Sequence, residues 1–193
     1  MSALLLAGLA VPPGLAAQAP PPGGIAEVER DYGLGFGVAT LGWDEASVPF
    51  DDVAMGTLSL ERDLWRGVSG RAAVAWGGTT LTADEPVDAG VWSLDLQVLL
   101  APEFGPLANL PVTPYAVGGL GALVTNPRGD LPTRSQSQWS YGAGIRGALA
   151  ERWGVMAEGT AVGVRFADPL VPENRETRTI HNIRWEGRLQ WRF

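Results

Sequence analysis

The sequence contains no cysteine and no lysine, and it has a single histidine, His181. Without cysteine the chain can form neither a disulfide framework nor a thiolate metal site. One histidine excludes a metal centre built from several histidines. The 14 basic residues, all arginine, stand against 21 acidic residues, and the net charge of -7 argues against nucleic acid as a partner. We therefore expect no cofactor and no bound metal.

Long apolar runs are also missing from most of the chain. Beyond the N-terminal region, no run approaches the roughly 18 apolar residues that a transmembrane helix needs. In hydrocarbon, every backbone N–H and C=O group needs a partner within the protein, and only helices and closed barrels provide one. If this chain spans a membrane, it must therefore do so as a closed β-barrel. Its 26 glycines and eight tryptophans favour β structure with close backbone packing.

The N-terminal region differs in composition from the rest. Ala3 to Val11 is an apolar stretch that is too short to span a bilayer, and Ala17-Gln18-Ala19 offers a small-x-small cleavage site. We predict a secretory signal peptide over 1–19, a flexible lead-in over 20–31 and one barrel domain over 32–193. The alternative is a disordered apolar terminus.

The C-terminal segment shows the clearest alternation of side-chain character. One parity is apolar and consists of Ile183, Trp185, Leu189, Trp191 and Phe193. The other parity is polar or charged and consists of Arg184, Glu186, Arg188, Gln190 and Arg192. Successive side chains of a strand point to opposite faces, so the pattern predicts a strand with one apolar and one charged face. Its length suits a tilted strand that crosses a membrane.

Similar alternation recurs along the chain and predicts an all-β fold, an eight-stranded antiparallel up-and-down transmembrane β-barrel. The expected strands are about 32–43, 53–63, 68–78, 91–101, 113–124, 138–149, 154–166 and 179–193. Longer polar connections follow the odd-numbered strands, at 44–52, 79–90, 125–137 and 167–178. Shorter links follow the even-numbered strands, although 102–112 is longer than the ideal. This sorting is typical of outer-membrane barrels, whose termini both lie on the periplasmic side.

The aromatic residues lie near strand ends and predict two interfacial belts, because amphipathic rings prefer the headgroup level. The belt beside the longer loops consists of Trp43, Trp76, Trp92 and Trp139. The belt beside the shorter turns consists of Trp65, Trp153, Trp191, Tyr115 and Phe193. Trp185 falls between the belts and is not explained by them.

Alternation alone does not say which face is inside, because a soluble lipocalin-like barrel turns its apolar face inward. The second face here is mainly Gly, Ala and Ser with some charges, which fits the narrow interior of eight strands, whereas several tryptophans would overfill it. The predicted lumen charges are Glu61, Asp63, Arg71, Asp95, Arg146, Glu158, Arg184, Glu186 and Arg188. Both signs occur, so we expect paired charges that form a structural plug; a polar path for solutes is the alternative.

Three stretches carry a family resemblance. Pro114 to Ala122, Gly142 to Gly159 and the closing Gln190-Trp191-Arg192-Phe193 resemble, in order and spacing, motifs of the outer-membrane protein β-barrel family, related to OmpA-like and OmpW-like barrels. The resemblance covers nearly all of 30–193. It implies an outer-membrane location in a Gram-negative-type bacterium, outer-membrane lipid as a partner, and recognition of Phe193 by the barrel-assembly machinery.

Fold does not determine function, and a barrel of this kind is compatible with three functions. The favoured one is a structural or surface-interaction barrel, not an enzyme, with an unidentified surface ligand at its loops. The alternative is a channel for small or apolar solutes. A lipid-modifying enzyme is less favoured. Lipid A deacylases carry a His-x-Ser-Asn pattern, and the similar segment here, His181-Asn182-Ile183-Arg184, lacks the serine. The acidic pairs Asp44-Glu45 and Asp51-Asp52 are interpreted as solvated loop charge.

Overall fold

The computed structural model describes residues 32–43, 50–81, 86–102, 112–129, 131–166 and 178–193. The predicted signal peptide, 1–19, and lead-in, 20–31, lie outside the described residues. Within the described ranges, no helix is long and apolar enough to cross a membrane.

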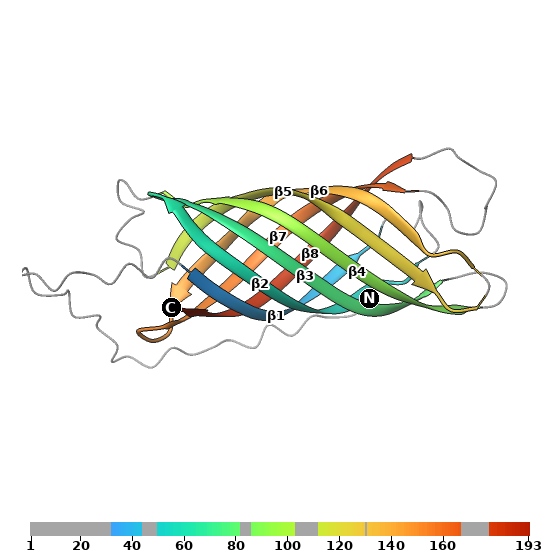
Figure 1. The fold of residues 1–193 in the computed structure, drawn as a ribbon, viewed down its shortest axis with the longest axis horizontal. Helices are drawn as coiled ribbons and strands as arrows, with labels where there is room; N and C mark the ends of the chain where they lie inside the picture. The colour runs from blue at the N-terminus through green and yellow to red at the C-terminus, as the bar shows by residue number, and fades with distance from the viewer. Residues whose placement is uncertain (1–31, 44–49, 82–85, 103–111, 130, 167–177) are drawn as a thin grey trace, which may run out of the picture.

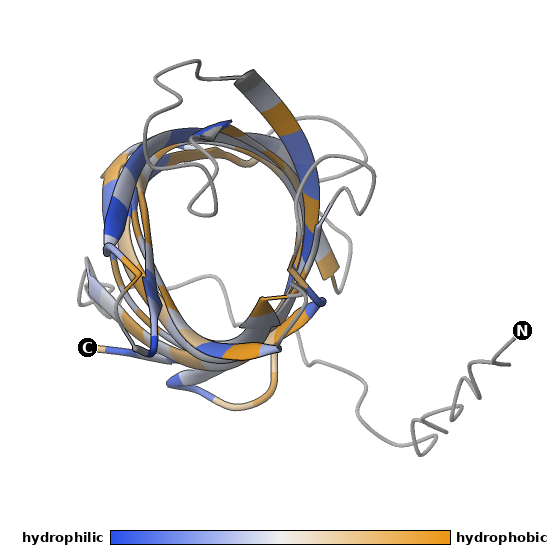
Figure 2. Cartoon of the chain, turned by 90° about the vertical axis from the view of Figure 1, so that its right-hand side faces the viewer, coloured by the Kyte–Doolittle hydropathy of each residue, from blue (hydrophilic) through white to orange (hydrophobic). Residues whose placement is uncertain are grey.

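Eight antiparallel strands form one closed barrel (Figure 1), which confirms the predicted fold class. The strands are β1 (Tyr32–Gly42), β2 (Val53–Trp65), β3 (Val68–Leu81), β4 (Val87–Leu100), β5 (Val112–Pro127), β6 (Arg134–Ala148), β7 (Trp153–Phe166) and β8 (Arg178–Arg192). Each strand pairs with its neighbours in sequence, and β8 pairs with β1. In the view of Figure 2, the strands close into a ring around a lumen.

The pairing register winds around the barrel with a fixed offset. Stepping from Gly90 on β4 across paired residues through β3, β2, β1, β8, β7, β6 and β5 leads back to β4 at Leu100, ten residues further along the strand. A closed sheet with such a stagger must tilt its strands relative to the barrel axis, as Figure 1 shows. This tilt determines which inward side chains meet across the lumen.

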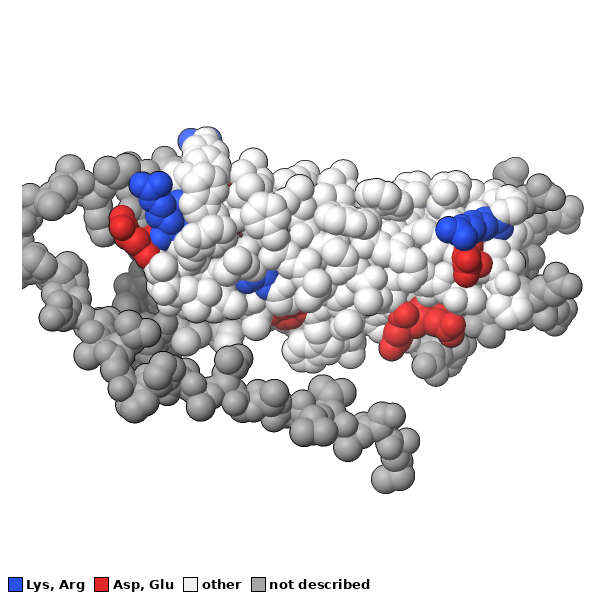
Figure 3. All heavy atoms as spheres, turned by 90° about the horizontal axis from the view of Figure 1, so that it is seen from below, with Lys and Arg blue, Asp and Glu red and all other residues white. Residues whose placement is uncertain are grey.

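Burial alternates along the strands and identifies the inward face. On β4, Val91, Ser93 and Asp95 are buried, whereas Trp92 and Leu94 are exposed. Exposed large apolar side chains recur around the barrel, including Trp185, which is 65% exposed, and Leu120, which is 71% exposed. This arrangement is the reverse of a lipocalin-like barrel. On the face shown in Figure 3, most charged side chains gather toward the two ends of the barrel.

The two ends differ in what they hold. We call the end with Tyr32 and Phe193 the terminal end, and the opposite one the far end. At the terminal end, β2 and β3 meet in a tight turn at which Gly67 adopts a positive φ of 67°. At the far end, β3 extends to Leu81 and β4 starts at Val87. The connection predicted over 79–90 is therefore mostly strand.

The other far-end connections change in the same way. β5 extends to Pro127 and β6 starts at Arg134, which shortens the connection predicted over 125–137. Polar residues such as Thr125 and Gln136 sit on the inward face of these strand extensions, where they are buried. Their polar composition predicted loops, although these segments pair as strands. The predicted sorting of long and short connections holds only in part.

Candidate functional site

A layer of charged side chains crosses the middle of the lumen. Its members project from the inward face of β2, β3, β4, β7 and β8, and small residues opposite them provide the space. A Cβ at Gly35 would overlap the side chains of Arg188 and Ser59, and one at Gly144 would overlap the ring of Tyr115. Glycine at these positions therefore lets long polar side chains fold into a narrow barrel.

Arg71 and Glu158 form the central ion pair of this layer. Arg71 Nη2 lies 2.7 and 2.9 Å from the two carboxylate oxygens of Glu158, and the two side chains are 0% and 3% exposed. Tyr115 donates its hydroxyl hydrogen to Glu158 at 2.9 Å, and Arg71 Nε donates to Gln97 at 2.6 Å. Since β3 and β7 are four strands apart in a ring of eight, the pair joins opposite walls.

Arg184 and Asp95 form a second pair across the lumen. Arg184 Nη1 lies 2.8 Å from Asp95 Oδ2, and β8 and β4 are again on opposite walls. Asp95 also accepts hydrogen bonds from Ser93 Oγ at 2.8 Å and from Gln138 Nε2 at 2.7 Å. Both carboxylates of the crossing pairs are therefore satisfied by several donors, which offsets the cost of burying them.

The remaining buried charges make a pair along one strand and a longer contact between β2 and β6, which also lie on opposite walls. Glu186 and Arg188 are both buried and pair with each other along β8. The carboxylate of Glu61 is also buried, and it lies 3.6 Å from Arg146 and 3.9 Å from Arg192. These separations are too long for hydrogen bonds.

One predicted lumen charge lies at the mouth of the lumen and not within the buried layer. Asp63 pairs in register with the buried Ser69, so it keeps the inward parity, but it lies near the end of β2. Its side chain is 41% exposed at the terminal end, where it accepts a hydrogen bond from Ser69 and lies 3.6 Å from Arg192. Arg192 was not among the predicted lumen charges, although it has the parity of Arg188.

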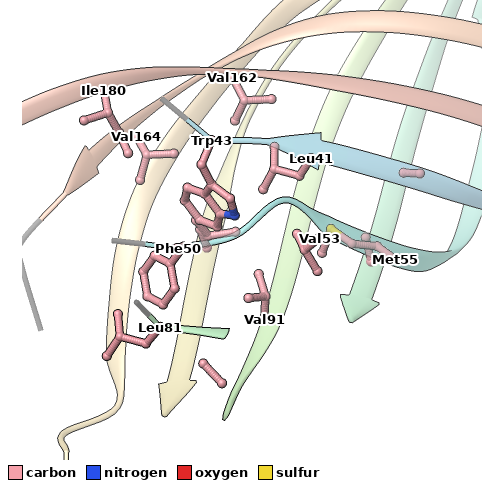
Figure 4. Close-up of a cluster of buried hydrophobic side chains, with 14 residues drawn as sticks. Leu41, Trp43, Phe50, Val53, Met55, Leu81, Val91, Val162, Val164 and Ile180 are labelled. Carbon is pink, nitrogen blue, oxygen red and sulfur yellow. The ribbon is translucent and has the colours of Figure 1, made fainter. Parts of the chain in front are cut away.

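The far end of the lumen holds a cluster of apolar side chains, which the sequence analysis did not predict. Buried side chains from β1, β2, β3, β4, β5, β7 and β8 pack together there (Figure 4). Their members include Leu41, Trp43, Phe50, Val53, Leu81, Val91, Leu123, Val162, Val164 and Ile180. The inward parity of each strand would have identified them. We call this group the far-end cluster.

Two aromatic residues assigned to the interfacial belts lie inside the barrel instead. Trp43 is 5% exposed and packs against Phe50 with ring centroids 5.2 Å apart (Figure 4). Tyr115 is 2% exposed and reaches Glu158. Both were assigned by their level along the strand, but their parity directs them inward. The prediction that Trp43 and Tyr115 belong to the interfacial belts was wrong.

The other belt residues are on the outer wall. At the far end, Trp76 and Trp92 pair across β3 and β4 with centroids 6.3 Å apart. Trp139 covers Gly163, where a Cβ would overlap its indole, and its ring lies 6.2 Å from that of His181. Trp185 covers Gly159 in the same way, which explains an aromatic residue between the belts.

The aromatic residues of the terminal end lie on the outer wall and at the seam between β1 and β8. Trp65 is 78% exposed and Trp153 is 40% exposed. Phe193 stacks on Trp191 with centroids 4.9 Å apart and on Tyr32 at 6.1 Å. The backbone N–H of Phe193 donates to the carbonyl of Tyr32 at 3.0 Å, which ties the end of β8 to the start of β1.

His181, the one histidine of the chain, faces outward, and its ring lies 6.2 Å from that of Trp139. Across the described ranges, no three His, Asp or Glu side chains come together as a metal site. The charged layer joins opposite walls of the barrel through paired charges.

Comparison with known proteins agrees with the geometry. The sequence profile of the outer membrane protein beta-barrel domain matches residues 1–193. No curated protein sequence matches the chain.

Solved structures share the fold at low sequence identity. Neisserial surface protein A is 10% identical with a TM-score of 0.63, covering 85% of this chain and 97% of its own. OprG from Pseudomonas aeruginosa is 12% identical with a TM-score of 0.55, covering 84% and 95%. Ail, the attachment invasion locus protein of Yersinia pestis, is 14% identical with a TM-score of 0.53, covering 84% and 98%.

Proposed function

Because this chain belongs to the outer membrane protein β-barrel family, we propose that it is a structural or surface-interaction barrel whose lumen is closed by ion pairs. Its place is the outer membrane. In such barrels the termini lie on the periplasmic side, so the terminal end faces the periplasm and the far end faces the cell surface.

The observation that carries this proposal is the pair of ion bridges across the lumen. Arg71 meets Glu158 and Arg184 meets Asp95, in each case from opposite walls and with side chains at most 6% exposed. An eight-stranded barrel leaves an interior only just wide enough for side chains. Opening a path would separate buried charges, which costs several kcal/mol for each ion left unpaired. We therefore expect the resting barrel not to conduct.

A closed barrel leaves its outer wall and its surface connections to interact. The exposed apolar side chains of the wall, such as Leu94, Leu96 and Trp92, suit outer-membrane lipid as the main partner. The net charge of -7 makes nucleic acid an unfavourable partner. One protein of similar fold carries an attachment role in its name, which supports a surface interaction here. The C-terminal strand is the segment that we expect the barrel-assembly machinery to recognise.

A channel for small or apolar solutes is the second candidate, and the far-end cluster favours it. The surface-facing part of the lumen holds these apolar side chains, alongside buried polar residues such as Thr125 and Gln136, and the apolar group would suit an apolar solute entering from outside. The charged layer below would have to part before such a solute could pass. A lipid-modifying activity has less support, since His181 has no serine beside it. We expect the lipid A mass spectrum to be the same with and without the gene.

Planar-bilayer conductance of the refolded protein tests the closed lumen. We expect no stable conductance from the natural chain. A variant with serine at Arg71, Glu158, Asp95 and Arg184 removes both crossing pairs without a change in net charge, and it should conduct. The matched control replaces the exposed pair Asp88 and Arg128 with serine and should stay closed. Stable conductance by the natural chain would overturn the proposal and favour the channel.

A further inference from the structure

A separate pocket opens at the terminal end, on the periplasmic side of the charged layer. It has a volume of about 390 Å³ and is formed by the ends of β5, β6, β7 and β8 and by the turn between β6 and β7. Its lining includes Arg146, Arg152 and Arg192, with Glu151 as the acidic member. Three arginines thus border one small space.

Arg146 and Arg192 lie near carboxylates without donating hydrogen bonds to them. Arg146 and Arg192 lie 3.6 and 3.9 Å from the buried Glu61, whose carboxylate oxygens accept no hydrogen bond from the described residues. Arg192 also lies 3.6 Å from the carboxylate of Asp63. Glu61 and Asp63 therefore orient both side chains electrostatically, while leaving the N–H groups near them uncommitted to these carboxylates. The guanidinium-bearing side chains are 22% and 34% exposed, so they reach the pocket.

The rest of the lining defines the size and character of a ligand. Gln190 and Thr113 add polar groups, and Trp153 and Val155 add apolar surface. Planar guanidinium groups match carboxylate and phosphate oxygens with two parallel hydrogen bonds. The volume lies at the lower end of the range for small-molecule sites. The lining thus suits an oxyanion carried on a small organic group.

We propose that this pocket binds a small organic anion, a phosphate or carboxylate, from the periplasmic side. Arg146 and Arg192 hold the oxyanion, and Arg152 adds a third basic side chain from the turn. The anion comes either from solution or from the headgroup of an inner-leaflet phospholipid, since the pocket lies at the periplasmic end of the barrel. Binding there does not depend on whether the lumen conducts.

Nuclear magnetic resonance of the arginine Nε–H groups tests the proposal on the full chain folded in dodecyl maltoside, which contains no phosphate. One arm titrates inorganic phosphate, and a second adds phosphatidylglycerol. We expect the resonances of Arg146, Arg152 and Arg192 to shift together. Replacing Arg146 or Arg192 with Gln should weaken binding on the order of tenfold, the loss of one charge-assisted hydrogen bond. Added salt should weaken it further.

Two variants keep the test decisive. Arg152→Gln changes an exposed turn residue and leaves the contacts of Glu61 intact. The variant should therefore fold normally and bind the anion more weakly. Arg62→Gln is the matched control at the same end, because Arg62 lies outside the pocket, 5.2 Å from the ring of Tyr32. Shifts with phosphate alone identify a soluble anion, and shifts only with phosphatidylglycerol identify a lipid headgroup. No shift in either arm, or equal weakening by Arg62→Gln, overturns the site.

Discussion

Arg71 and Glu158 meet at 2.7 Å although their strands lie on opposite walls of the barrel. Such a bridge fixes the lumen at one cross-section, because neither side chain can withdraw without leaving the other charged and buried. Tyr115 and Gln97 add hydrogen bonds to the same pair. The layer therefore constrains which side chains face inward.

This constraint predicts a large penalty for breaking one side of the pair. Glu158→Gln leaves Arg71 buried without its counter-charge and should lower the free energy of unfolding by about 3–5 kcal/mol. Replacing both residues together, Arg71→Met with Glu158→Leu, should recover most of that loss. Urea unfolding in phospholipid vesicles, followed by tryptophan fluorescence, measures both variants.

The exposed pair at the far end provides the comparison for this measurement. Arg128 and Asp88 lie 3.2 Å apart with side chains 81% and 67% exposed. Solvent screening limits such pairs, so Asp88→Asn should cost less than about 1 kcal/mol. A cost for Glu158→Gln no larger than that for Asp88→Asn would contradict the buried bridge.

The inward position of Trp43 gives a second prediction, in stability and in fluorescence. Trp43→Ala empties part of the far-end cluster and should destabilise the fold by about 3–5 kcal/mol. Brominated lipid should quench Trp92, which is 51% exposed on the outer wall, but not Trp43, which is 5% exposed. Trp43→Phe should thus remove emission that lipid does not quench, whereas Trp92→Phe should remove quenchable emission. Equal loss of quenchable emission in both variants would show that Trp43 faces lipid.

Most of the fold could be predicted from the sequence because a strand has a period of two. Alternation in residues 183–193 separated the face of Trp185 and Trp191 from that of Arg184 and Arg188. Since no free edge is tolerated in a membrane, apolar outer faces on every strand also implied closure. The structure follows both inferences.

The contacts across the lumen could not be predicted in the same way. That Arg184 meets Asp95, and not another carboxylate, depends on the ten-residue offset that accumulates around the barrel, which periodicity within one strand does not encode. Uncharged members of the layer, such as Gln138, could not be predicted from the balance of positive and negative residues. Trp43 and Tyr115 were misassigned because level along a strand was given more weight than parity.

The glycines of the inward face lead to a third prediction. Gly144→Ala would place a methyl group where the ring of Tyr115 lies and 2.8 Å from the carbonyl oxygen of Ala157. We expect this overpacking to cost about 1–3 kcal/mol, because Tyr115 would have to leave Glu158. The midpoint and slope of urea unfolding measure the effect.

Gly187 is the matched control, since it lies on β8 with no atom within 4 Å of an added Cβ. Gly187→Ala should be neutral or stabilising by up to about 0.4–1 kcal/mol, through the reduced freedom of the unfolded chain. Similar losses in both variants would show that glycine is needed for the strand backbone and not for space inside the lumen.

The seam between β1 and β8 gives the fourth prediction, which separates stability from assembly. Phe193 is 49% exposed, and its backbone N–H bonds to Tyr32 regardless of the side chain. Phe193→Ala should therefore cost only about 1–2 kcal/mol in protein refolded into lipid, the loss of a half-buried ring. If the terminal ring is also read by the assembly machinery, the amount of folded protein in cells should fall by much more than that stability loss explains. Leu189→Ala, on the same strand and 41% exposed, should have matched stability and near-normal levels in the outer membrane. Parallel losses for the two variants, in lipid and in cells, would mean that Phe193 acts only by holding the seam closed.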